Sequence, residues 1–219
     1  MERKEFKHMM IKTVLFDFDG TLIDTNDLIY HSFDYTFKKF GYSFTEEEIL
    51  QFNGPPLRET FSKINPELAE EMIETYREHN AAHHAEYVKL FPNVKETLDI
   101  LQEKGYDLGV VTAKMREGVE QGMEITGIGS YFDTIITIDD VTNPKPHPEP
   151  VLKALEKLNA VPDTAIMIGD NYHDIIAGNK AGTKTAGVSW SVKGKEYLKQ
   201  FNPTYMLEDM TDLLAIVGV

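Results

Sequence analysis

The chain has 219 residues, 42% of them hydrophobic and 11% aromatic, which is enough to bury the core of one large domain or two smaller ones. Its formal net charge of −14 argues against a nucleic-acid-binding protein, because such a protein needs a basic face. The absence of cysteine excludes disulfides and thiolate chemistry, and no stretch approaches the roughly 20 apolar residues of a membrane helix. We therefore expect a cytoplasmic monomer or weak homo-oligomer with no nucleic-acid or membrane partner.

Five short apolar runs, rich in β-branched residues, predict the strands of a sheet. They lack an alternate polar face, as is typical of parallel strands covered on both sides. Helix and strand alternate from residue 93 onward, and this alternation predicts a doubly wound, Rossmann-like α/β fold with a mostly parallel sheet. The predicted strands cover residues 12–16, 106–112, 134–138, 164–168 and 183–188.

The segment over residues 22–91 interrupts this alternation and predicts helices only. The dipeptide Asn65-Pro66 is a good start for the last of these helices, with Asn as the cap and Pro at the first helical position. A helical block inserted after the first strand indicates a helical cap domain, with a catalytic core formed by residues 1–21 and 92–219. The four expected helices cover residues 26–40, 45–52, 56–64 and 66–88.

The strongest chemical signal is the run Asp17-Phe18-Asp19-Gly20-Thr21, directly after the first predicted strand. In an extended chain Asp17 and Asp19 point the same way, while Phe18 points to the opposite face. Two carboxylates this close repel each other, so that one is protonated or a cation lies between them. Gly20 permits a sharp turn at this point. For this motif alone, a capped turn with two solvated acids is the alternative.

A second acidic group follows another predicted strand. Asp170 comes after the strand over residues 164–168, and Asp174 lies one helical turn beyond it. Ligands of open α/β sheets bind outside the carboxyl ends of the strands, so we expect Asp17, Asp19 and Asp170 to meet in one crevice. A cluster with only oxygen donors suits Mg²⁺. An N-cap of the following helix is the alternative role for Asp170.

Two further strand ends supply hydrogen-bond donors for a phosphate group. The hydroxyl of Thr112 closes one strand. Lys145 lies in a loop between Pro144 and Pro146, which stiffen the loop and hold the lysine in place, as an electrophilic clamp on phosphate requires. A solvated surface lysine is the alternative.

Taken in chain order, these motifs resemble the four motifs of the haloacid dehalogenase (HAD) superfamily, and residues 22–90 resemble its inserted helical cap. The resemblance implies that Asp17 is the nucleophile that forms an aspartyl-phosphate, and that Asp19 protonates the leaving group and then activates water. It also implies Mg²⁺ bound by the Asp17 side chain, the Asp19 backbone carbonyl and Asp170, with Asp174 in support. The implied catalytic set is Asp17, Asp19, Thr112 and Lys145.

Specificity in this superfamily lies in the cap, so we also expect cap residues to contact the substrate. Arg58 is a candidate for a second anionic group, with an exposed helix residue as the alternative. Lys114 either reaches the leaving group or only contacts solvent. His79, His83 and His84 have the spacing of a metal pair, but a solvated or packed helix face is the preferred interpretation. The predicted substrate-binding residues are Gly20, Thr21, Asn53, Gly54, Arg58, Ala113 and Lys114.

The whole chain further resembles the PpaX-type inorganic pyrophosphatases of Gram-positive bacteria, through stretches such as residues 21–26, 170–175 and 181–188. This implies hydrolysis of pyrophosphate to two phosphates. Phosphoglycolate phosphatases share the cap type and the motifs, so they or another small-phosphomonoester phosphatase are the alternative. A mutase of the β-phosphoglucomutase type would use the same aspartates but protect the aspartyl-phosphate from water. A receiver-like signalling domain is disfavoured, because no helical insertion follows its first strand.

Overall fold

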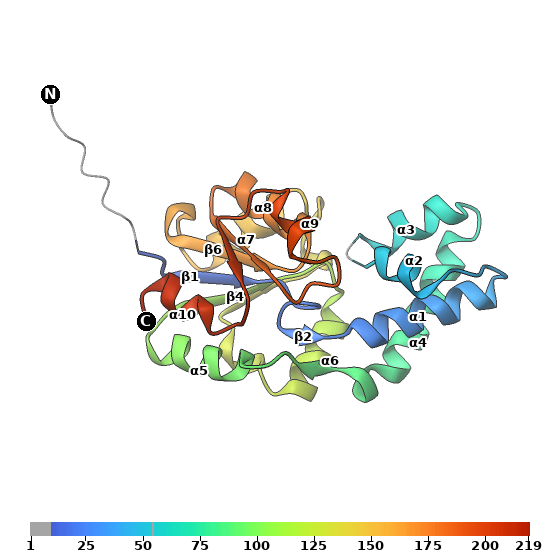
Figure 1. Cartoon of the computed structure of the whole chain (residues 1–219), viewed down its shortest axis with the longest axis horizontal. Helices are drawn as coiled ribbons and strands as arrows, with labels where there is room; N and C mark the ends of the chain where they lie inside the picture. The colour runs from blue at the N-terminus through green and yellow to red at the C-terminus, as the bar shows by residue number, and fades with distance from the viewer. Residues whose placement is uncertain (1–9, 54) are drawn as a thin grey trace, which may run out of the picture.

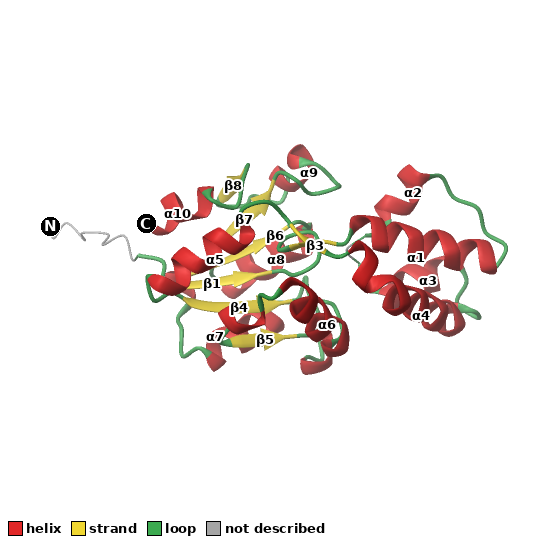
Figure 2. Ribbon diagram, turned by 90° about the horizontal axis from the view of Figure 1, so that it is seen from below, coloured by secondary structure: helices red, strands yellow, loops and turns green. Residues whose placement is uncertain are grey.

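The computed structural model describes residues 10–53 and 55–219, and it comprises a sheet flanked by helices and a helical lobe beside it (Figures 1 and 2). Six strands form one sheet in the order β5-β4-β1-β6-β7-β8, and every neighbouring pair is parallel. The predicted doubly wound α/β fold is therefore confirmed. The strands are β1 Thr13–Phe16, β4 Asp107–Val111, β5 Thr134–Ile136, β6 Ala165–Gly169, β7 Lys184–Val188 and β8 Tyr205–Leu207.

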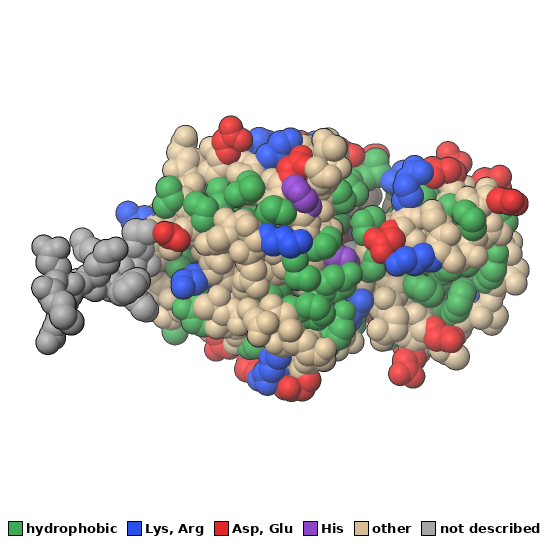
Figure 3. All heavy atoms as spheres, turned by 90° about the horizontal axis from the view of Figure 1, so that it is seen from above, with side chains coloured by type: hydrophobic (Ala, Val, Ile, Leu, Met, Phe, Trp, Pro, Cys, Tyr) green, Lys and Arg blue, Asp and Glu red, His purple; other side chains and the backbone are tan. Residues whose placement is uncertain are grey.

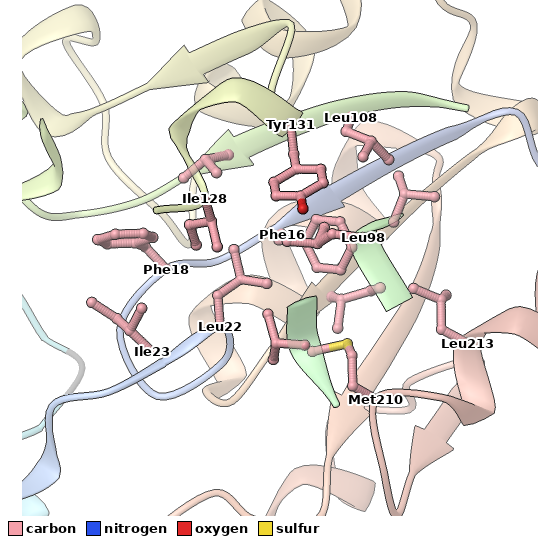
Figure 4. Packing of buried hydrophobic residues seen from close by; sticks show 14 of the residues in the cluster. Phe16, Phe18, Leu22, Ile23, Leu98, Leu108, Ile128, Tyr131, Met210 and Leu213 are labelled. Carbon is pink, nitrogen blue, oxygen red and sulfur yellow. The ribbon is translucent and has the colours of Figure 1, made fainter. Parts of the chain in front are cut away.

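Strand β1 lies in the middle of the sheet, and all four of its residues are buried. Val14 and Phe16 pack into a hydrophobic cluster with α5, α6 and α10 (Figure 4), whereas Leu15 packs on the opposite face with α7 and α8. Burial of both faces explains why the strands lack a polar alternation. The covering helices are α5 Val94–Glu103, α6 Arg116–Thr126, α7 Glu149–Lys157, α8 Tyr172–Ala181 and α10 Asp212–Val217.

The predicted strands agree with the observed strands to within one residue at each end, with one exception, and some elements were not predicted. The strand expected over residues 134–138 ends at Ile136, because the backbone N–H and hydroxyl of Thr137 donate to the Asp140 carboxylate at 2.8 and 2.9 Å and start a 3-10 turn. Strand β8 and helices α6, α9 and α10 lie outside the predicted elements. Helix α9 covers Lys195–Lys199, and the 3-10 turns cover Gly129–Tyr131, Ile138–Asp140 and Pro162–Thr164.

The helical lobe follows β1 in the chain and has its own aromatic core. Its buried side chains include Phe33, Phe37 and Phe61, and they form a cluster separate from those of the sheet. The prediction of helices only over residues 22–91 is wrong at both ends of the segment, where the short strands β2 (Ile23–Asp24) and β3 (Lys89–Leu90) pair antiparallel as the chain enters and leaves the lobe. This separate core supports the proposed cap domain. Its helices are α1 Asn26–Lys39, α2 Glu46–Gln51, α3 Leu57–Ile64 and α4 Ala69–Tyr87.

Helix α4 begins three residues later than the sequence predicts. The side chain of Asn65 does accept hydrogen bonds, from the backbone N–H groups of Glu67 and Leu68 at 3.0 and 3.3 Å. These bonds close a turn that precedes the helix, so the helix itself starts at Ala69. The asparagine therefore caps the connecting turn and not the first turn of α4.

Two further features concern the hydropathy of the described helices and the surface charge of the described residues. In the described part of the chain, no helix combines the length and the apolar character needed to cross a membrane. On the face shown in Figure 3, the acidic and basic side chains of the described residues are interspersed and form no extended basic patch.

Candidate active site

Two carboxylates directly after β1 face a cavity between the sheet and the helical lobe. The Asp17 N–H extends the pairing of β1 with β6 by donating to the Ile168 carbonyl at 2.8 Å. The next residue, Phe18, is fully buried in the core (Figure 4). Asp17 and Asp19 line the cavity, whose volume is about 590 Å³. The structure therefore confirms that Asp17 and Asp19 point to the same side and Phe18 to the opposite side.

Three aspartates and one lysine meet at this end of the sheet, and all four are buried. Asp17, Asp170 and Asp174 each present a carboxylate oxygen, and these oxygens lie within 4.8 Å of one another. The Nζ of Lys145 lies 2.7 Å from Oδ1 of Asp17 and 2.5 Å from Oδ1 of Asp174, and it donates to the Val111 carbonyl at 2.7 Å. The structure thus brings together residues from the ends of β1 and β6, the start of α8 and the loop after β5.

Two glycines let the acidic side chains come this close. Gly20 has φ +80°, and a Cβ there would lie 2.4 Å from Oδ2 of Asp170. A Cβ on Gly169 would lie 2.2 Å from Cγ of Asp174, so neither position tolerates a side chain. The sharp turn predicted at Gly20 is confirmed. Neither Gly20 nor Thr21 lines the cavity within the described residues, because Gly20 lies behind Asp170 and Thr21 is fully buried.

Helix α8 is capped by Asn171 and not by Asp170. The Asn171 side chain accepts from the His173 N–H at 3.5 Å, and the Asn171 N–H donates to the Asp174 carboxylate at 3.0 Å. The alternative N-cap role for Asp170 is therefore wrong, because its side chain lines the cavity. Its backbone is held in place by the Ser191 hydroxyl, which donates to the Asp170 carbonyl at 2.6 Å.

The cluster holds more acidic groups than basic ones. Burial raises the pKa of Asp17 to about 7; Lys145 opposes this rise and Asp174 adds to it. Burial also raises the pKa of Asp170 well above its ordinary value, and the other two aspartates reinforce the effect. Burial acts to lower the pKa of Lys145, but Asp17 and Asp174 outweigh it and hold that pKa above its ordinary value. One ammonium group therefore faces three buried carboxyl groups.

Asp19 lies beside this cluster and has its own lysine. The Nζ of Lys114 is 2.9 Å from Oδ1 of Asp19. The Lys114 backbone N–H donates to the Thr112 hydroxyl at 3.1 Å, which fixes the start of this loop. Thr112, Ala113 and Lys114 all line the cavity, as the sequence predicts. Of the two alternatives for Lys114, the structure favours the one in which the side chain points into the site.

The helical lobe contributes the loop before α3. Asn53 lines the cavity, and its carbonyl accepts from the Asn171 side chain at 3.4 Å. Arg58 also lines the cavity, but it pairs with Glu70 at 2.5 Å and its side chain is 72% exposed. This position agrees with the alternative of an exposed helix residue. Gly54, another predicted substrate-binding residue, lies outside the described residues.

One face of α4 supplies cavity residues that the sequence did not assign to the site. Tyr76, Arg77, Asn80 and His84 line the cavity at helical spacing. His84 is 1% exposed, and neither of its ring nitrogens has a hydrogen-bond partner in the described part of the chain. Burial lowers the pKa of His84 to about 4, so its ring is neutral at physiological pH. A periodic pattern in α4 could have shown this face, but not that it meets the sheet lobe.

The sequence matches the family model of haloacid dehalogenase-like hydrolases over residues 14–188. The chain belongs to the haloacid dehalogenase-like hydrolase family. The resemblance drawn from the four motifs is thereby confirmed. The matched range contains the complete cluster, from Asp17 at the end of β1 to Asp174 in the first turn of α8.

Relatives within this hydrolase family match nearly the whole chain. The pyrophosphatase PpaX of Oceanobacillus iheyensis is 54% identical over 210 residues, covering 96% of this chain and 98% of its own. A solved haloacid dehalogenase-like family hydrolase from Streptococcus pneumoniae has a TM-score of 0.84 at 28% identity, covering 94% of this chain and 97% of its own. A structure described as a predicted phosphoglycolate phosphatase from Haemophilus somnus has a TM-score of 0.82 at 25% identity, covering 95% and 98%.

The donors of this hydrolase-family site fit a hard divalent cation. All three members of the cluster offer carboxylate oxygens, and all three are buried. Oxygen-only donor sets favour Mg²⁺ or Ca²⁺ over softer ions. Burial raises the pKa of Asp17 and of Asp170, and a cation bound beside them would oppose this rise by stabilising the charged carboxylates.

Proposed function

We propose that this hydrolase cleaves inorganic pyrophosphate into two phosphates, with Mg²⁺, through a phosphorylated Asp17. The observation that carries the proposal is the buried cluster of Asp17, Asp170 and Asp174 at one end of the cavity, in which Lys145 contacts Asp17 and Asp174. The Asp17 and Asp170 side chains and the Asp19 carbonyl would hold Mg²⁺, which when bound supplies charge neutralisation for the phosphoryl oxygens. Asp174 holds Lys145.

The reaction proceeds in two displacements on phosphorus. In the first, an Asp17 oxygen attacks, the bond to the bridging oxygen breaks, and Asp19 gives a proton to the departing phosphate. In the second, Asp19 takes a proton from water, the water oxygen attacks phosphorus, and the bond to Asp17 breaks to release the second phosphate. Lys145 offsets the charge on Asp17. The Thr112 hydroxyl accepts from the Lys114 N–H, which leaves its own hydrogen to donate to a transferring oxygen.

The pairing of Asp19 with Lys114 suits a phosphate leaving group. Phosphate is a much weaker base than the alkoxide of a phosphate ester, so its departure depends less on complete proton transfer. The Lys114 ammonium, 2.9 Å from Asp19, can neutralise charge on this group as the bond breaks. Arg77 is an exposed residue of α4 that lines the cavity, and we propose that it binds the same phosphate.

Three observations support separate parts of the proposal. The 54% identity over nearly the full length with a protein named pyrophosphatase supports pyrophosphate as the substrate. A cytoplasmic location is part of the proposal, and the sequence without cysteine is consistent with a reducing compartment. The tightly held Lys145 supports catalysis by positioning and charge neutralisation, which phosphoryl transfer requires.

A small phosphomonoester is the second candidate substrate, because part of the cavity wall is apolar. Phe52 and Ile73 from the helical lobe and Met115 from the sheet lobe line it. The volume of about 590 Å³ lies within the range of roughly 300–1,000 Å³ that is usual for organic ligands. Pyrophosphate has no carbon to place against this wall, whereas an organic ester does.

A phosphate-release assay with Mg²⁺ decides between these candidates. It compares kcat/KM for pyrophosphate, phosphoglycolate, glucose 1-phosphate and a nucleoside monophosphate. The highest value for pyrophosphate supports the proposal, and a clear preference for an organic ester contradicts it. Isomerisation of a sugar phosphate with a bisphosphate activator, without phosphate release, would instead indicate a mutase.

A further inference from the structure

The helical lobe contacts the sheet lobe on two sides of the active-site cavity. On one side, β2 pairs with β3 where the chain enters and leaves the lobe, and both β3 and α4 pack against α6. On the other side, the end of α2 and the two residues after it approach the start of α8 and the loop after β7 (Figures 1 and 2). We call residues 51–53 the cap edge. The chain passes between the lobes on the first side, so non-covalent contacts hold the cap edge in place.

Two hydrogen bonds join the cap edge to the sheet lobe. The Lys193 ammonium donates to the Gln51 carbonyl at 3.3 Å, and the Asn171 amide donates to the Asn53 carbonyl at 3.4 Å. Gln51 is the last residue of α2, and the final carbonyls of a helix have no partner within it. The sheet lobe therefore supplies hydrogen-bond donors for backbone groups at the end of this cap helix.

Both donors belong to segments that also position Asp170. Asn171 directly follows Asp170 in the chain. The Ser191 hydroxyl donates to the Asp170 carbonyl at 2.6 Å and accepts from the Lys193 backbone N–H at 3.2 Å. The loop after β7 thus contacts the aspartate cluster through Ser191 and the cap edge through Lys193.

The Lys193 side chain is held beside the cavity but not in it. Its Nζ lies 5.8 Å from the centre of the Tyr197 ring of α9, within the range of a cation–π contact. Lys193 is partly buried, and it is not among the described residues that line the cavity. This lysine can therefore act on the substrate only through the cap edge.

We propose that Lys193 is a positioning residue for the hydrolysis, because its contact with Gln51 holds the cap edge over the aspartate cluster. Asn53 of the cap edge lines the cavity, and a lobe fixed by the chain on one side can populate a second position at small cost. Apparent substrate affinity falls in proportion as the binding-competent position becomes less populated. The inference rests on the proposed reaction in this cavity, but it does not require that pyrophosphate is the substrate.

Steady-state phosphate release at saturating Mg²⁺ tests this role. Lys193→Met removes the ammonium but keeps the backbone N–H that contacts Ser191, so it should raise KM by about fivefold and change kcat by less than about twofold. Lys193→Arg keeps a donor and should restore KM to near the wild-type value. The matched control is Lys195→Met, which removes a neighbouring lysine that pairs with Glu208 and should keep the wild-type KM. An unchanged KM for Lys193→Met, or a raised Mg²⁺ requirement as its only effect, would overturn the proposal.

A distance measurement provides a readout that needs no turnover. The chain has no cysteine, so spin labels on Ser62→Cys in α3 and Lys180→Cys in α8, both exposed positions, report the separation of the two lobes. With Mg²⁺ and inorganic phosphate, the labelled protein should show one narrow distance distribution, and Lys193→Met should add a population at longer distance. Identical distributions with and without Lys193→Met would overturn the proposal.

These measurements separate the role of Lys193 from the choice of substrate. If the wild type released no phosphate from pyrophosphate, the proposed substrate would be wrong, whereas the distance comparison would still decide the role of the lysine. The kinetic comparison would then use the ester with the highest kcat/KM. If Lys193→Met did not fold, Lys193→Gln, whose shorter side chain does not reach as far, would serve the same two measurements.

Discussion

Lys145 connects two buried carboxylates: its Nζ lies 2.7 Å from Oδ1 of Asp17 and 2.5 Å from Oδ1 of Asp174. Its third contact is the Val111 carbonyl at 2.7 Å, so all three ammonium hydrogens have an acceptor. The proposed nucleophile is therefore oriented before a substrate arrives. Because the lysine is the cation nearest to the three buried acids in the described structure, much of the local charge balance depends on it.

Lys145→Met should abolish activity and lower the free energy of unfolding by about 3–5 kcal/mol, because it leaves buried acids without their partner. Denaturant unfolding of the metal-free protein at neutral pH measures this loss. Lys114→Met is the matched control: its partner Asp19 is 19% exposed, so the expected stability loss is about 1 kcal/mol or less. Equal losses of stability for the two variants would contradict the assigned role of Lys145.

Asp17→Asn should reduce phosphate release by about ten-thousandfold or more while the fold is retained, because an amide oxygen cannot form the acyl phosphate. Steady-state phosphate release measures the first effect and circular dichroism the second. Mass spectrometry of the acid-quenched wild-type reaction should show one added phosphoryl group on the peptide that contains Asp17. Near-normal turnover by the variant would remove Asp17 from the nucleophile role.

The fold and the centre of the site follow from local sequence signals. Uninterrupted apolar runs identified the parallel strands, and the carboxyl ends of parallel strands share one edge of a sheet. For this reason Asp17, Lys145 and Asp170 could be placed together although they are far apart in the chain. The tight turn at Gly20 was predictable too, because few other residues adopt its φ of +80°.

The residues contributed by the helical lobe could not be predicted in the same way. The position of the helical lobe on the sheet decides which polar residues of α4 face the cavity. The sequence around Arg77 or His84 contains no signal of that position. Helix α6 was not predicted because Val119 and Met123 are its only large buried side chains, too few for a clear helical period. At α8, Asp170 and Asn171 are adjacent and both can cap a helix, so only the structure distinguishes them.

Without metal, the protein should lose stability as the pH rises from about 4 to above 7. The pKa of Asp17 is raised from 3.8 to about 7 in the folded state, so the folded state holds this proton more tightly than the unfolded state. Its contribution is complete below pH 4 and is lost as the pH passes 7. Unfolding measured across this range in a chelator should show the decline, and excess Mg²⁺ should remove most of it. Asp17→Asn lacks one of the two carboxyl groups with a raised pKa, so its decline should be smaller, and an undiminished decline in that variant would assign the effect to Asp170.

Arg77→Gln should raise the KM for pyrophosphate by about tenfold, since a charged hydrogen bond to the leaving phosphate contributes about 1.5–3 kcal/mol. Arg58→Gln should have a smaller effect, because the Arg58 guanidinium is already paired with Glu70 at 2.5 Å. Steady-state kinetics of the two variants with saturating Mg²⁺ compares them directly. A larger effect at Arg58 would mean that its pairing with Glu70 breaks when the substrate binds.

His84→Leu should make the protein less sensitive to acid. Burial lowers the pKa of His84 to about 4 from 6.5, so the folded state disfavours the charged ring. Above pH 6.5 the ring is neutral in both the folded and the unfolded state, so it does not change the free energy of unfolding. As the pH falls from 6.5 toward 4, the unfolded state takes up the proton first and the protein loses stability. Unfolding at pH 7.5 and pH 5 in excess Mg²⁺ should show a smaller difference for the leucine variant than for the wild type. His147→Gln is the control, because it replaces an exposed histidine that does not line the cavity. If His84→Leu kept the full acid sensitivity, the ring nitrogens of His84 in the wild type would be hydrated in solution. The group responsible for the acid sensitivity would then be His173, whose pKa burial also lowers to about 4.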